Sequence, residues 1–150
     1  MQVKDMMTKD PACCASDTSL AEVARMMVDN DCGEIPVVDN NSSKQPIGVV
    51  TDRDIVCRTV AKGLNPLDLT AADCMSTSIV TVTADLSLEE CCRLMEEKQI
   101  RRVPVVDDRG SVSGIVALAD VALSTGKNVA GQIVKEVSEP ATASAAAGQK

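Results

Sequence analysis

Apolar residues recur at helical spacing in two stretches of the chain, and a capping signal precedes each stretch. Ser19 and Ser87 are each followed three positions later by a glutamate, which is the capping-box pattern. The apolar positions after them are Leu20, Val23, Ala24 and Met27 in the first stretch and Leu88, Cys91, Cys92 and Met95 in the second. This spacing predicts two amphipathic helices.

Short β-branched runs and turn residues follow each of these helices. The predicted strands are residues 35–39 and 47–50 after the first helix, and residues 103–107 and 112–116 after the second. A further helical stretch closes each set, at 54–62 and 120–125, and a glycine ends it. With a strand before the first helix, each set has the order strand, helix, strand, strand, helix.

The two sets are copies of one repeat. A shift of 68 positions aligns Met7 with Met75 and Pro36 with Pro104, and after the loop at 40–45 a shift of 66 aligns Gly48 with Gly114. The predicted units are repeat 1 at 3–63, a linker at 64–73 and repeat 2 at 74–126. Because a copy this small buries too little surface alone, we expect an α/β fold in which the two sheets pack face to face about a pseudo-twofold axis.

Beyond the second copy, the pattern changes twice. Val129, Ile133, Val134 and Val137 fall mostly on one helical stripe, which predicts a helix over 127–137. Residues 138–150 are low in complexity and lack large apolar side chains, so we expect a disordered tail.

The amino-acid composition argues against several classes of function. The formal net charge is -7, and the chain has no Phe, Tyr, Trp or His. Acidity and the lack of stacking side chains argue against nucleic acid as a partner, and the lack of histidine removes the commonest general base and metal ligand. Without an apolar run near its beginning or a membrane-length segment, the sequence predicts a cytoplasmic protein that is not bound to membrane. No nucleophile-base pair, Walker-type glycine loop or carboxylate pair stands out, so we do not expect an enzyme.

The segment at 48–54 is the strongest candidate for a ligand-binding site. An apolar strand ends there, and Thr51 and Asp54 stand at the start of the helix that follows. One interpretation is structural: Thr51 caps the helix and Asp54 favours its positive end. The other is functional, since a hydroxyl at this point can contact a phosphate and a nearby carboxylate can accept both hydroxyls of a ribose. The two interpretations are compatible.

Together, the duplication, the Ile-Pro-Val and Val-Pro-Val strands and the Gly-x-x-Thr-x-x-Asp motif resemble a tandem pair of CBS domains, or Bateman module. The resemblance extends to stand-alone bacterial CBS-pair proteins, which implies a dimer and a stress context. For the site it implies an adenosyl ligand between the repeats, with Thr51 on phosphate, Asp54 on ribose, and Ile35 and Val37 beside the base. The implied ligand is AMP, ADP or ATP, or else NAD or S-adenosylmethionine, and no cofactor is required.

Three arginines are further candidates for phosphate contacts. Arg53 lies inside the motif, and Arg101 and Arg102 hold a place where some CBS proteins carry basic phosphate ligands. In repeat 2 the equivalent of Thr51 is Ala117, while Asp120 is kept. The second site is therefore expected to bind weakly, to take another ligand or to stay empty.

Two other functions stay open. The seven cysteines could form a thiol or metal sensor, although the adjacent pair Cys13 and Cys14 would point to opposite faces of a strand. Alternatively both sites are degenerate, and the module only dimerises in a stress-related role. We expect a homodimer formed through its helices, with a partner enzyme or transporter that the sequence does not name, and no metal site.

Overall fold

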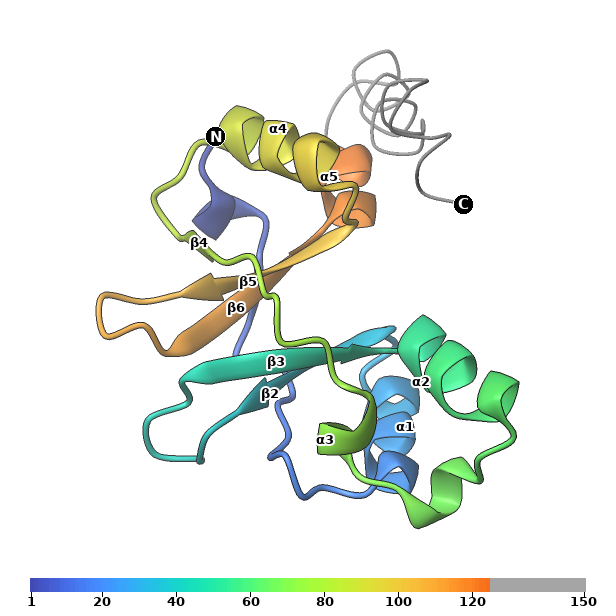
Figure 1. Cartoon of the computed structure of the whole chain (residues 1–150). Coiled ribbons are helices and arrows are strands. Elements are labelled where there is room, and N and C mark those ends of the chain that lie inside the picture. Colours follow the sequence, from blue (N-terminus) through green and yellow to red (C-terminus); the bar gives the residue numbers. More distant parts are fainter. Residues whose placement is uncertain (125–150) are drawn as a thin grey trace.

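The computed structural model describes residues 1–124, so the predicted helix at 127–137 and the tail at 138–150 lie outside the described residues. The first half contains α1 (Leu20–Asp29), β2 (Glu34–Val38), β3 (Pro46–Thr51) and α2 (Asp52–Arg58). The second half repeats this order with α4 (Leu88–Lys98), β5 (Arg102–Val106), β6 (Val112–Ala117) and α5 (Leu118–Ser124) (Figure 1). The shorter elements are β1 (Thr8–Lys9), α3 (Ala71–Cys74), β4 (Val82–Thr83) and three 3-10 turns at Val3–Asp5, Val60–Lys62 and Pro66–Asp68.

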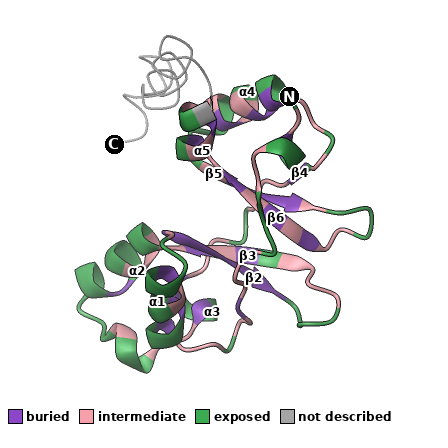
Figure 2. Ribbon diagram, turned by 180° about the vertical axis from the view of Figure 1, so that it is seen from behind, coloured by how far each residue is buried: buried purple, intermediate pink, exposed green. Residues whose placement is uncertain are grey.

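The amphipathic helices form as their patterns predict. The hydroxyls of Ser19 and Ser87 accept hydrogen bonds from the amides of Glu22 and Glu90, each at 3.2 Å. The buried side chains are Leu20, Val23 and Met27 on α1, and Leu88, Cys91 and Met95 on α4. Most of the predicted apolar positions therefore face the interior, and Figure 2 shows the buried residues on the strands and the inner helix faces.

The helix predicted at 54–62 is in fact two shorter elements. The α-helical part ends at Arg58, and the 3-10 turn Val60–Lys62 follows it. Between them, Thr59 leaves the helical conformation and its hydroxyl donates to the carbonyl of Ile55, a bond that bends helices. Gly63 closes the turn at φ 75°, a left-handed conformation that favours glycine.

The strands form two sheets that lie between the helix pairs (Figure 1). One is the antiparallel hairpin β2–β3, and the other has the order β1-β6-β5-β4, in which only β4 and β5 are parallel. Ile35 and Val37 belong to the first core, under α1, and Val103 and Val105 belong to the second. Since side chains alternate along a strand, the opposite faces, which carry Glu34 in β2 and Arg102 in β5, lie toward the other repeat.

Segments of each half complete the core of the other. Val3 is fully buried in the second core, and its amide donates to the carbonyl of Leu86 at 2.9 Å. Ala71 and Cys74 belong to the first core, although they directly precede the second half. The two exchanged segments pair with strands at equivalent positions of the repeat. Thr8 lies opposite Ile115 in β6, and its equivalent Ser76 lies opposite Val49 in β3. The two halves are therefore joined by an exchange of segments as well as by their sheets.

The exchanged segments pass very close to two strands, at positions where both strands have glycine. A Cβ on Gly48 would lie 2.8 Å from the carbonyl oxygen of Ser76, and one on Gly114 would lie 3.1 Å from that of Thr8. Both distances are shorter than ordinary contacts, so the absence of a side chain permits each crossing.

Candidate ligand site at the junction of the repeats

Thr51 and Asp54 form a reciprocal capping box where β3 becomes α2. The Thr51 hydroxyl accepts a hydrogen bond from the Asp54 amide, and Asp54 Oδ2 accepts one from the Thr51 amide, both at 3.0 Å. Asp54 Oδ1 also lies 3.8 Å from Arg58 Nε. Arg58 Nη1 in turn donates to the carbonyls of Cys74 and Met75, at 3.1 and 3.0 Å. The capping interpretation of this motif is confirmed.

The capping bonds leave both side chains with hydrogen-bonding capacity. The Thr51 hydroxyl acts here as an acceptor, so its proton is free to be donated to a ligand. The Asp54 carboxylate has about four lone-pair sites, of which the capping bond uses one. Its side chain is 19% exposed. The structural role and a ligand-binding role can therefore coexist at this helix end.

Glu34 lies beside this motif, and sequence reasoning did not single it out. It is the register partner of Thr51, and directly opposed residues project from the same face of a sheet. The residue is only 8% exposed, and its Oε2 has no hydrogen-bond partner. Burial raises the pKa of this carboxyl to about 7, against the lowering effect of Arg102 and with a smaller raising effect from Asp54. The available signal in the sequence was a charged residue directly before the β-branched run that begins at Ile35.

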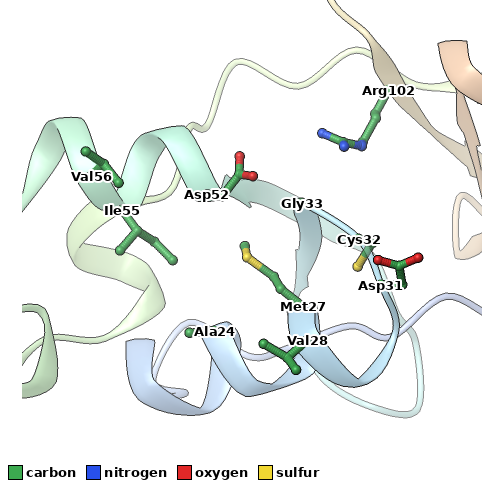
Figure 3. Close-up of a pocket in the computed structure, with 10 residues that line it drawn as sticks. All are labelled: Ala24, Met27, Val28, Asp31, Cys32, Gly33, Asp52, Ile55, Val56 and Arg102. Carbon is green, nitrogen blue, oxygen red and sulfur yellow. The ribbon is translucent and has the colours of Figure 1, made fainter.

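Arg102 crosses from the second half to the first. It is the repeat equivalent of Glu34, and it lines a cavity of about 560 Å³ between α1 and α2 (Figure 3). A Cβ on Gly33 would lie 2.8 Å from Asp52 Oδ2 and 3.2 Å from Arg102 Nη2, so glycine leaves room for both side chains. The other lining residues are Ala24, Met27, Val28, Asp31, Cys32, Ile55 and Val56.

The remaining predicted site residues are not gathered at this point. Ile35 and Val37 are fully buried in the first core, where α1 covers them. Arg53 is exposed on α2, and Arg101 is exposed just before β5. Asp120 is partly buried on α5. Among the eight predicted residues, only Arg102 lines the cavity, and the ligand contacts of all eight remain predictions.

The cysteines are free thiols, and several of them are buried. Burial is the main cause that raises the pKa of Cys14 to about 12 and that of Cys91 to about 11. Within residues 1–124, no group of three or more Cys, Asp or Glu side chains is placed to hold a metal ion. Thiols of this kind react slowly because the thiolate is the nucleophile.

We expect the cysteines to differ in reactivity according to their burial. Brief alkylation of the native protein with iodoacetamide should modify the exposed Cys57 first and leave Cys14 and Cys91 unmodified, as peptide mass spectrometry would measure. Alkylation after unfolding provides the control, in which all seven cysteines should react. Fast modification of Cys14 in the native protein would favour the thiol-sensor alternative.

Comparison with known proteins decides the family. A model of the CBS domain matches residues 3–58 and again residues 71–124, which together make up more than half of the chain. The chain belongs to the CBS-domain family. The tandem CBS pair expected from the repeat and its motifs is thus confirmed.

Three curated relatives are similar over most of this CBS pair. The CBS domain-containing protein YhcV of Bacillus subtilis is 40% identical over 126 residues, which are 84% of this chain and 86% of YhcV. Hypoxic response protein 1 of Mycobacterium tuberculosis is 35% identical over 137 residues, 91% of this chain and 94% of the relative. An uncharacterised protein of Methanopyrus kandleri is 37% identical over 118 residues, 79% of this chain but 57% of that protein.

Two solved structures share the fold of this CBS pair. Hypoxic Response Protein I, solved with two coordinated zinc ions, has a TM-score of 0.74 and 33% identity, and the match covers 84% of this chain and 100% of that one. The CBS domain pair of protein MJ0100, solved with methylthioadenosine and S-adenosylmethionine, has a TM-score of 0.75 and 27% identity, with the same coverage. Within the described part of this chain, no helix has the length and apolar character that a bilayer crossing requires.

Proposed function

We propose that this CBS pair is a cytoplasmic regulatory module that binds an adenosyl ligand where its repeats meet and acts by binding rather than by catalysis. The ligand class comprises AMP, ADP, ATP, NAD and S-adenosylmethionine. The observation that carries the proposal is the convergence of Glu34, Thr51 and Asp54 from the first repeat with Arg102 from the second. The bound adenosyl ligands of the MJ0100 pair support the same class.

In this proposal Thr51 lies beside the 5′ substituent and donates its hydroxyl proton where that group is a phosphate, and Asp54 accepts the ribose hydroxyls. Because the site draws on both repeats, a ligand would hold β2 and β5 at one separation. At their far ends the two hairpins already touch, since the Lys44 carbonyl accepts from the Val112 amide at 2.9 Å and Gln45 donates to the Arg109 carbonyl at 2.7 Å. With the hairpins already in contact at one end, a ligand bound at the other end would change how the two repeats pack on each other.

The test is a calorimetric titration of the purified protein with AMP, ADP, ATP, NAD and S-adenosylmethionine. We expect at least one of them to bind with a dissociation constant below about 1 mM. Guanosine monophosphate serves as the control, because the resemblance implies an adenine base. If none of the adenosyl compounds binds in this range, the proposal fails.

A homodimer formed through the helices is the second part of the proposal. Apolar side chains are exposed on and after α1 and α2, including Val28 at 79% and Val56 at 56%. Val60, Leu64 and Leu67 extend this apolar surface along the chain. Exposed apolar side chains that gather in one patch are typical of an interface. A second copy would cover it and extend the ligand-dependent movement to the assembly.

Replacing Val56 with glutamate should convert the dimer to a monomer, because association would then bury an unpaired charge. Size-exclusion chromatography with light scattering measures the change in mass. Ala72→Glu, which adds the same charge at an exposed position on α3, should leave the dimer intact. A Val56→Glu protein with the mass of the parent would contradict this interface.

A further inference from the structure

The buried carboxyl of Glu34 needs an explanation. Within residues 1–124, its Oε2 is the buried side-chain oxygen that has no hydrogen-bond partner. A buried polar atom left in this state costs free energy, so proteins rarely keep one without a reason. Glu34 opens β2 on the face toward the second repeat, opposite Thr51. In the proposed site, where Thr51 lies beside the 5′ substituent, Glu34 would lie beside that substituent too.

Negative side chains outnumber positive ones around Glu34. Asp54 and Asp52 come from α2, and Arg102 comes from the other repeat. Arg58 adds a second positive charge through its contact with Asp54. Asp31 lines the same cavity, so three aspartates face two arginines: the set has one excess negative charge when Glu34 is protonated and two when it is ionised. Ionised Glu34 thus opposes a second anion at this point, because charge repulsion is strong where water is excluded.

We propose that Glu34 selects the ligand by the charge of its 5′ substituent, so that the site prefers an adenosyl ligand with an uncharged or cationic 5′ group over one with a 5′ phosphate. This inference rests on the proposed function and narrows its ligand class. The thioether of methylthioadenosine and the sulfonium of S-adenosylmethionine are 5′ groups of the preferred kind. A phosphate is of the disfavoured kind unless Glu34 is neutral.

The selection should depend on pH near neutrality. Burial raises the pKa of Glu34 to about 7, so the carboxyl is mostly ionised above that pH and mostly protonated below it. The penalty on a 5′ phosphate is therefore present above about pH 7 and is lost as the pH falls through this value. Phosphate itself gains a proton near pH 6, which changes its own charge in the same range. A variant without the Glu34 charge separates the two effects.

The experiment compares methylthioadenosine with AMP, which differ only at the 5′ group, by calorimetry at about pH 6 and about pH 8. The parent protein should bind methylthioadenosine about tenfold or more tightly than AMP at the higher pH, and the ratio should shrink at the lower pH. Glu34→Gln should raise AMP affinity about tenfold at the higher pH and change methylthioadenosine affinity little. Glu97→Gln, an equal charge change at an exposed position of α4, should behave like the parent.

The outcomes separate this inference from the proposed function. If both ligands bind and Glu34→Gln leaves their affinity ratio unchanged, the role of Glu34 is overturned while the proposed function stands. If no adenosyl compound binds the parent protein, both are overturned. Should Glu34→Gln fail to fold in a thermal melt, Glu34→Met removes the same charge with an apolar side chain of similar length, which also removes the unpaired buried oxygen. It should raise AMP affinity relative to methylthioadenosine affinity at the higher pH, and an unchanged ratio would refute the selection.

Discussion

Replacing Asp54 with asparagine should weaken the binding of every adenosyl ligand by about 10- to 100-fold. Hydrogen bonds to a charged acceptor contribute about 1.5–3 kcal/mol, and the variant removes the charge that would accept the ribose hydroxyls. Because the ribose is common to all candidate ligands, the loss should not depend on the 5′ group. Calorimetric titration with the tightest ligand of the parent protein measures the change.

Asp120→Asn is the matched control for this prediction, since it makes the same change at the equivalent position of the second repeat. We expect it to leave the affinity within about twofold of the parent, because Ala117 stands there in place of the Thr51 hydroxyl. Asp54 also belongs to the capping box, so a denaturation curve must show that Asp54→Asn is folded at the titration temperature. A folded Asp54→Asn protein with parental affinity would remove Asp54 from the site.

Deleting residues 1–9 should destabilise the protein by about 3–5 kcal/mol, the largest stability effect we expect. The segment buries Val3 completely in the second core and packs Met6 and Met7 against it. Full burial of one such side chain contributes about 1.5–3 kcal/mol. The deletion also removes β1 from the edge of β6 and the bonds from the amides of Val3 and Lys4 to the second half. A whole domain has only about 5–15 kcal/mol in reserve.

Urea unfolding followed by far-ultraviolet circular dichroism measures this loss, since the chain has no Trp or Tyr to report by fluorescence. A decrease of the melting temperature by about 10 °C or more should accompany it. Lys4→Ala, at a side chain that is half exposed, is the control and should change the stability by less than about 1 kcal/mol. A truncated protein as stable as the parent would show that the exchanged segment contributes little.

The features predicted correctly are those that local pattern determines. The spacing after Ser19 and Ser87 specifies amphipathic helices whatever surrounds them, and the aligned Pro36 and Pro104 reveal the duplication directly. The break at Thr59 was not predicted, because it depends on a hydroxyl turning back to its own helix in competition with a normal helical pattern. Periodicity contains no signal for that choice.

Contacts between the repeats could not be predicted in the same way. Met7 and Met75 are equivalent in sequence, so either could pack on either strand hairpin, and only the three-dimensional arrangement assigns each to the opposite half. The same limit applies to Glu34 and Arg102. In the sequence they are two charged residues, each at the beginning of a strand. They form part of one site only because the packing of the two repeats brings them close together.

The exchange of segments also bears on how such a protein is made and how it arose. During synthesis the first half cannot close its core until the residues around Ala71 and Cys74 have left the ribosome, while Val3 must wait for the second half. A single copy of the repeat could reach the same packing only by exchanging its first residues with another chain. Because both copies stand in one chain, each half receives its missing segment from the other, and we expect neither half to fold when it is cut free.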